Sequence, residues 1–228
     1  MEKSKISASE MSKRIDHTLL KPEAPRSSFD SLCSEALLYG FKAVCVNSAR
    51  VADVARKVRG SEVAVCAVVG FPLGAMHRAA KAYEAEKAIE DGATELDMVM
   101  NIGALKDGAL KIVEADIRAV RQTAADPVIL KVIIETCLLT DAEKMQASEI
   151  AKQVGADFVK TSTGFSSGGA TAEDVALMRR IVGPEMGVKA SGGIKDWSTA
   201  EAMIKAGADR LGTSAGVAIV ESAPEAFS

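Results

Sequence analysis

Polar and ionisable side chains stand within several otherwise apolar stretches of the sequence, often two residues apart. They include Asp16, Thr18, Glu95, Asp97, Lys131, Lys160 and Lys189. Because successive side chains of a β-strand point to opposite faces, residues two apart share one face. Isolated charges are costly to bury, so a shared buried face would require these groups to pair with one another or to serve a function.

Lys160 and Lys189 offer the most specific chemistry of this set. A free lysine has a pKa near 10.4, so roughly one molecule in 2,500 carries the neutral amine at pH 7. Lowering such a value by about three units, which takes about 4 kcal/mol, prepares an amine for Schiff-base formation. A second cation in a partly apolar site can supply that shift. The alternative is that the lysines are solvated or salt-bridged and that Asp97 simply pairs with Lys131.

Three glycine-rich segments point to a bound anion. Residues 161–165 (TSTGF), 191–194 (SGGI) and 212–216 (GTSAG) each follow an apolar stretch. Small residues let backbone N–H groups approach an anion closely, and the loops after the last two strands form the usual phosphate site of TIM barrels. One such segment would indicate only a turn, but three favour a phosphorylated ligand.

Apolar stretches alternate with amphipathic ones along the chain, and no Pro/Gly/Ser-rich linker divides it. Near-continuous apolar runs are typical of parallel strands covered on both faces. We therefore predict one α/β domain over residues 1–228, a TIM (β/α)₈ barrel with a short helical lead at about residues 7–14. The predicted strands are residues 15–20, 41–46, 63–69, 94–100, 128–134, 157–161, 187–190 and 210–213, and the helices are residues 28–39, 48–59, 78–91, 109–123, 142–154, 172–181 and 199–206.

A weak internal repeat supports the barrel. Residues 92–96, 155–159 and 207–211 each begin with Gly-Ala. We expect each glycine to end a helix in the left-handed conformation and to lead into a strand. The alternative is an open, doubly wound sheet, which usually carries a glycine-rich dinucleotide fingerprint after its first strand. Residues 16–22 (DHTLLKP) do not resemble that fingerprint.

The composition disfavours several classes of function. A net charge of −3 with 4% aromatic residues argues against nucleic-acid binding. The first 16 residues lack the apolar core of a signal peptide, and the apolar run at residues 63–70 is too short to span a bilayer, so we expect a cytoplasmic protein. Four scattered cysteines and two distant histidines, His17 and His77, show no zinc-ligand spacing, which disfavours a metal-dependent aldolase.

Several long motifs, in order along residues 15–214, resemble the deoxyribose-phosphate aldolase family. They are residues 15–21 (IDHTLLK), 44–46 (VCV), 95–101 (ELDMVMN), 131–135 (KVIIE), 158–165 (FVKTSTGF), 188–194 (VKASGGI) and 212–214 (GTS). The resemblance implies a class I aldolase that reversibly cleaves 2-deoxy-D-ribose 5-phosphate to acetaldehyde and D-glyceraldehyde 3-phosphate, in deoxyribose phosphate catabolism. It also implies that no metal or organic cofactor is needed, and it suggests a homodimer or homotetramer.

The same resemblance assigns roles to residues. Lys160 would form the Schiff base, Lys189 would be the nearby cation that keeps this amine neutral and relays protons, and Asp97 would be the general acid/base, acting through a water. The residues lining the site would be Asp16, Thr18, Cys45 and Lys131, and those contacting the phosphate would be Gly164, Gly193, Gly212 and Ser214. Two features depart from some family members: Phe165 stands where they carry lysine, and the C-terminal residues contain no tyrosine.

Two rival functions fit part of this pattern. Another Schiff-base aldolase or a transaldolase would use the same lysine on a different sugar phosphate. A barrel that binds sugar phosphates without catalysis would need the glycine-rich loops but not the set of Lys160, Lys189 and Asp97. The presence of that whole set favours an enzyme.

Overall fold

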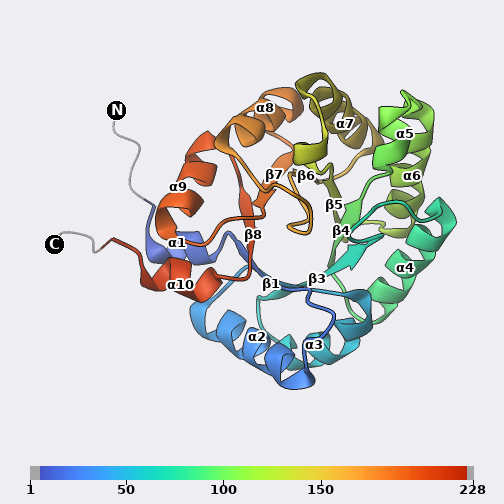
Figure 1. Ribbon diagram of the computed structural model, residues 1–228. Helices are drawn as coiled ribbons and strands as arrows, with labels where there is room; N and C mark the ends of the chain where they lie inside the picture. Colours follow the sequence, from blue (N-terminus) through green and yellow to red (C-terminus); the bar gives the residue numbers. More distant parts are fainter. Residues whose placement is uncertain (1–5, 225–228) are drawn as a thin grey trace.

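Eight parallel strands close into a barrel in the computed structural model, which describes residues 6–224 (Figure 1). The strands pair in chain order, and β8 pairs with β1 to complete the ring. Their bounds are β1 Ile15–Leu19, β2 Ala43–Val46, β3 Ala64–Val69, β4 Glu95–Val99, β5 Ile129–Ile133, β6 Phe158–Lys160, β7 Gly187–Ser191 and β8 Arg210–Thr213. The predicted TIM barrel is confirmed. The alternative of an open, doubly wound sheet is wrong, because the strand order of such a sheet reverses at a switch point, whereas these strands pair in chain order around a closed ring.

Helices form the outer ring in Figure 1. Those that follow strands are α2 Arg26–Tyr39, α3 Val51–Val58, α4 Arg78–Glu90, α6 Leu110–Thr123, α7 Asp141–Val154, α8 Ala172–Val182, α9 Trp197–Ala206 and α10 Gly216–Glu221. The lead helix is α1 Ala8–Ser12, and α5 Ile102–Lys106 precedes α6. The short helices α5 and α10 are too brief to show helical periodicity in the sequence, and the pattern did not predict them.

Local sequence signals explain where many of these helices begin and end. Ser7 and Thr140 each form a capping box with a glutamate three residues later, which satisfies free N–H groups of the first turn. Gly155 and Gly207 adopt left-handed conformations at the ends of α7 and α9, as the Gly-Ala repeat predicted. The short turns that follow return the chain directly to β6 and β8.

The two faces of the strands differ in chemistry. Residues such as Leu96, Met98 and Val132 are fully buried against the helices. The lumen instead receives the charged residues and a small apolar cluster of Leu20, Ala43, Cys45, Cys66 and Val68. Within residues 6–224, no helix combines the length and the apolar character needed to cross a membrane.

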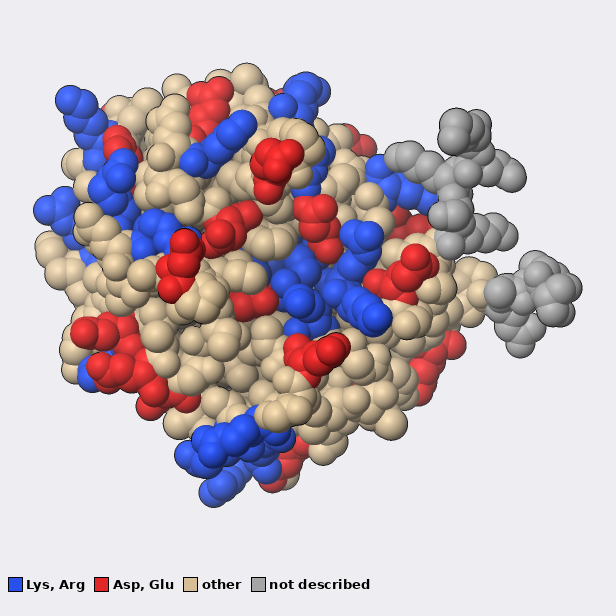
Figure 2. Space-filling view, turned by 180° about the vertical axis from the view of Figure 1, so that it is seen from behind, with Lys and Arg blue, Asp and Glu red and all other residues tan. Residues whose placement is uncertain are grey.

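The face opposite to that of Figure 1 carries charges of both signs. Figure 2 shows basic side chains near the centre of this face with acidic side chains around them. In this view of the described residues there is no broad basic surface of the kind that binds the phosphates of nucleic acids. The structural interest of the barrel therefore lies in its lumen and at the carboxyl ends of its strands.

A candidate active site in the barrel lumen

Asp97 lies at the centre of the lumen and binds three lysines. Its Oδ2 accepts hydrogen bonds from Lys160 Nζ and Lys189 Nζ, each at 2.7 Å, and its Oδ1 accepts one from Lys131 Nζ at 2.8 Å. The carboxylate is inaccessible to solvent. The strand register brings these side chains together. Asp97 on β4 lies opposite Lys131 on β5, and Lys160 on β6 lies opposite Lys189 on β7.

A second tier of charges completes the network. Asp16 on β1 accepts hydrogen bonds from Lys189 and from Arg210 Nε, the latter at 2.8 Å. Glu95 on β4 accepts from Arg210 at 2.9 Å and pairs with Lys131 at 2.5 Å. Each of these carboxylates therefore binds at least two cations, and this pairing offsets the free-energy cost of removing the charges from water.

The network contains one more positive group than negative groups. Its anions are Asp16, Glu95 and Asp97, whereas its cations are Lys131, Lys160, Lys189 and Arg210. Loss of one proton would balance the charges. A guanidinium does not lose its proton in proteins, and Lys131 and Lys189 each bind two carboxylates at close range. Lys160 binds one carboxylate and faces the cavity, so it is the amine of the network that a ligand can reach.

The pKa directions agree with strong pairing inside the lumen. Burial alone would raise the pKa of Asp97, but Lys131, Lys160 and Lys189 hold it well below its usual value. Burial would likewise lower the pKa of Lys189, but the carboxylates of Asp16 and Asp97 outweigh it and raise that pKa. The pKa of Asp16 is also lowered, since Lys189 and Arg210 outweigh its burial. Asp97 and Asp16 thus remain anionic and Lys189 cationic at neutral pH.

A cavity of about 420 Å³ opens above this network, within the size range of small-molecule sites. Lys160 forms part of its wall at the end of β6. The other predicted residues that line it are Thr18, Gly164, Gly193, Gly212 and Ser214. The remaining predicted residues, Asp16, Cys45, Asp97, Lys131 and Lys189, are fully buried and are not among the residues lining the cavity.

The loops after β6, β7 and β8 form one side of the cavity. Gly164 and Gly193 adopt φ values of 83° and 80°, which favour glycine over other residues. The backbone N–H groups of Gly164, Gly193 and Ser214 donate no hydrogen bond within residues 6–224. These three donors are therefore available to an anion, as the glycine-rich segments predicted.

Glu135 holds the first of these loops in place. Its carboxylate accepts hydrogen bonds from the backbone N–H and the hydroxyl of Thr163, next to Gly164. Glu135 itself has a φ of 57°, an uncommon conformation for a residue other than glycine. No sequence pattern identified this role, because it depends on a backbone conformation that the letters do not encode.

Arg210 and Cys66 are further residues of the site that the sequence interpretation did not select. Arg210 lies two positions before Gly212 on β8, and this spacing could have placed it on the lumen face. Cys66 pairs with Cys45 in the register of β2 and β3, and its thiol donates to Asp97 Oδ1 at 3.1 Å. Burial raises the pKa of the Cys66 thiol well above its usual value, so the thiol stays protonated.

One group of described residues lies closely enough together to hold a metal ion. It consists of Cys45, Cys66 and Asp97, whose ligand atoms lie within 4.8 Å of one another. Lys131 Nζ lies 3.5 Å from Cys66 Sγ and binds Asp97, so a cation there would have to displace an ammonium group. His17 lies outside this group, because it pairs with Glu35 of α2 at 2.6 Å. The donor set thus suits ion pairing better than metal binding.

Comparisons with known proteins identify the family of the chain. The model of a family described as DeoC/LacD family aldolase matches residues 10–222. The deoxyribose-phosphate aldolase of Geobacillus sp. (strain WCH70) is 59% identical over 211 residues, which are 92% of this chain and 95% of that protein. That of Clostridium perfringens (strain 13 / Type A) is 58% identical over 212 residues, or 93% and 95% of the two chains. The tetrameric deoxyribose phosphate aldolase structure from Aeropyrum pernix superposes with a TM-score of 0.88 at 34% identity, covering 95% of this chain and 92% of that one.

Proposed function

Because the chain belongs to the DeoC/LacD family of aldolases, we propose that it cleaves 2-deoxy-D-ribose 5-phosphate reversibly through a Schiff base on Lys160. The chain is a carbon–carbon lyase of that family. The observation that carries the residue assignment is the position of Lys160, whose amine lies between the cavity and the Asp97 carboxylate. It is the one lysine of the buried network that lines the cavity among the described residues.

The first half of the reaction forms an electron sink. The neutral amine of Lys160 attacks the C1 aldehyde of the open-chain sugar, and loss of water from the carbinolamine gives an iminium ion. A base then removes the proton of the C3 hydroxyl. The C2–C3 bond breaks, its electron pair moves into the iminium, and glyceraldehyde 3-phosphate leaves.

The second half regenerates the enzyme. The enamine left on Lys160 takes a proton at C2 and becomes the iminium of acetaldehyde. Water adds to that iminium, and collapse of the adduct releases acetaldehyde and the free amine. Each proton removed is returned in a later step, so the cycle needs no oxidant or other co-reactant.

Asp97 and Lys189 support these proton transfers from below the cavity. Asp97 is inaccessible to solvent and its pKa is held low by Lys131, Lys160 and Lys189 despite burial. In the acid/base role proposed for Asp97, a water from the cavity would carry the proton between its carboxylate and the reacting atoms. Lys189 keeps its positive charge beside the Lys160 amine, since both ammonium groups bind the same oxygen of Asp97.

The phosphate of the substrate fits the side of the cavity formed by Gly164, Gly193 and Ser214. Their available N–H groups favour an anion, and no carboxylate is among the described residues that line the cavity. Gly212 has a steric role, because a Cβ there would lie 2.9 Å from Ser191 Cβ and 3.1 Å from Lys189 Cε. Thr18 on β1, the strand next to β8, also lines the cavity.

Reductive trapping tests the nucleophile and the substrate together. Incubation with acetaldehyde and borohydride should attach a two-carbon adduct to the peptide that contains Lys160, and the Lys160→Arg variant should carry none. Product analysis with 2-deoxyribose 5-phosphate should yield acetaldehyde. Trapping without this cleavage would point to an aldolase for another sugar phosphate, and an adduct on a different lysine would refute the assignment.

The remaining expectations concern the setting of the enzyme. A homodimer or homotetramer is supported by the tetrameric relative from Aeropyrum pernix and by exposed apolar side chains such as Leu38 on α2 and Tyr83 on α4. A cytoplasmic location is supported by four cysteines that form no disulfide. Light scattering and cell fractionation test these two points.

A further inference from the structure

Two buried thiols of the lumen take no part in the proposed Schiff-base chemistry. Cys45 on β2 and Cys66 on β3 belong to the small apolar cluster of the lumen and are inaccessible to solvent. They lie opposite each other in the register of these two parallel strands. Their sulfur atoms and a carboxylate oxygen of Asp97 lie within 4.8 Å of one another. The lumen thus holds two nucleophilic groups beside the carboxylate that binds the lysines.

The spacing of the two strands suits a disulfide between these cysteines. Neighbouring strands of a sheet lie about 4.8 Å apart, so the Cα atoms of residues in register are separated by about that distance. Disulfides join residues whose Cα atoms lie about 4.4–6.8 Å apart. Both side chains point into the lumen, because residues in register share one face of the sheet. A bond between the two sulfurs therefore needs rotation of the side chains and no movement of the strands.

The two thiols differ in their acidity. A hydrogen bond with Cys66 lowers the pKa of the Cys45 thiol. The ammonium groups of Lys189 and Lys160 also lower this pKa, whereas burial and the charge of Asp97 oppose them. Burial raises the pKa of the Cys66 thiol well above its usual value. Because the thiolate is the form that attacks an oxidant, Cys45 is the thiol that reacts first and Cys66 is the one that completes the bond.

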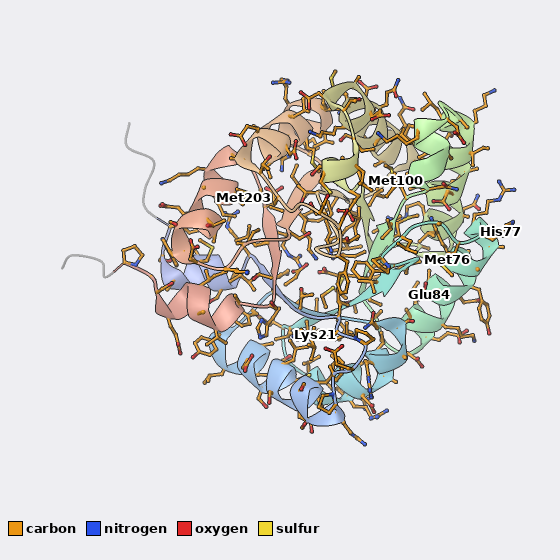
Figure 3. The ribbon with its side chains drawn as sticks, in the orientation of Figure 1. Lys21, Met76, His77, Glu84, Met100 and Met203 are labelled. Atoms are coloured by element: carbon orange, nitrogen blue, oxygen red, sulfur yellow. The ribbon has the colours of Figure 1, made fainter. Side chains whose placement is uncertain are left out.

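The cysteine pair lies directly below the wall of the cavity. Thr18 lines the cavity and is in register with Cys45 on the neighbouring strand. Leu20 lines the cavity as well, and it packs in the same lumen cluster as the two cysteines. Figure 3 shows Lys21, the residue after Leu20, within the ring of helices beside β1. A small uncharged oxidant that enters the cavity is thus separated from the thiols only by these side chains.

We propose that Cys45 and Cys66 form a peroxide-sensitive pair, which hydrogen peroxide converts to a disulfide that reversibly slows the enzyme. The sulfur of Cys45 attacks one oxygen of the peroxide, the O–O bond breaks, and a sulfenic acid and one water form. The sulfur of Cys66 then attacks the sulfur of the sulfenic acid, and its proton leaves with the hydroxyl group as a second water. The two thiols lose two electrons, and one peroxide takes them up.

The disulfide acts on catalysis through Asp97. Cys66 donates its S–H to Asp97 Oδ1 at 3.1 Å in the reduced protein. A disulfide has no S–H, so Asp97 Oδ1 keeps Lys131 as its one partner among the described residues. Loss of one hydrogen bond corresponds to roughly a fivefold change in a rate or equilibrium constant. This effect on the rate rests on the proposed function, whereas the formation of the disulfide does not.

The test treats the protein with hydrogen peroxide in a Cys137→Ser background, because Cys137 is exposed and would be oxidised independently. Mass spectrometry of unreduced peptides should find residues 45 and 66 joined. The kcat/KM for 2-deoxyribose 5-phosphate should fall about fivefold in the same sample. Dithiothreitol should reverse both changes, which separates the disulfide from methionine sulfoxide, since sulfoxide is reduced by dedicated enzymes.

Two further variants in this background provide the controls. Cys45→Ser lacks the attacking thiol, and peroxide should leave its activity at the level of its own untreated sample. Cys33→Ser removes a buried cysteine of α2 that packs in the outer core, so it should form the disulfide and lose activity as the background does.

Three results would overturn the inference: no linked peptide, a disulfide that leaves kcat/KM unchanged, or a reversible loss in Cys45→Ser as large as in the background. A protein that forms the disulfide but never cleaves 2-deoxyribose 5-phosphate would instead refute the proposed function and support the thiol pair. The mass measurement does not depend on activity, so the two failures are distinguishable.

Discussion

The positive charge of Lys189 is the component of the lumen whose removal tests the electrostatics of the site most directly. The substitution Lys189→Met keeps a chain of similar length and removes the ammonium group. Asp16 retains Arg210 as a partner in this variant, and Asp97 retains Lys131 and Lys160. The barrel should therefore still fold, while the amine of Lys160 loses a neighbouring cation.

The distances set the size of the expected effect. Lys160 Nζ and Lys189 Nζ each lie 2.7 Å from the same oxygen of Asp97, so they are separated by at most twice that distance. Two unit charges about 5 Å apart repel by roughly 3 kcal/mol at an effective dielectric constant of about 20. At 1.36 kcal/mol per unit, this repulsion corresponds to an effect of about two pH units.

The assay is the pH dependence of kcat/KM, which reports ionisations of the free enzyme. In Lys189→Met the acidic limb of the profile should move upward by about two pH units, with a lower plateau from the lost proton relay. Lys189→Arg serves as the matched control, because it keeps the charge and should leave the acidic limb in place. An unmoved limb in a folded Lys189→Met variant would refute the role assigned to this charge.

Three further predictions follow from the same network. Lys160→Ala should abolish cleavage and leave the circular dichroism spectrum of the folded barrel unchanged; near-normal turnover would contradict the mechanism. Arg210→Met removes a partner of two buried carboxylates, Asp16 and Glu95, and should lower the free energy of unfolding in urea by roughly 3–5 kcal/mol. The control Arg118→Met removes an exposed i,i+4 pair and should change the free energy of unfolding by under about 0.5 kcal/mol. Because the pKa of Asp97, despite its burial, is held low by Lys131, Lys160 and Lys189, its contribution to stability is present above pH 4 and is lost as the pH falls. Asp97→Asn should flatten the decline in stability below pH 4, and an unchanged slope would count against this pairing.

The sequence by itself determined which residues share the lumen face and where the strands lie. The spacing of Glu95 and Asp97 and the apolar stretches around Lys160 and Lys189 were sufficient, because the period of a β-strand is fixed by local backbone geometry. The Gly-Ala repeat likewise located the ends of helices, since left-handed φ values favour glycine. These features depend on residues close together in the chain.

Tertiary structure alone decided which of these charges meet. Asp16 lies 173 residues from Lys189 and 194 from Arg210, and only the closure of β8 onto β1 brings them into contact. The closure also decided that Asp97 is shared by three lysines and that Lys160 is the one beside the cavity. Such pairings depend on strand register around the whole ring, and no short stretch of sequence contains both partners.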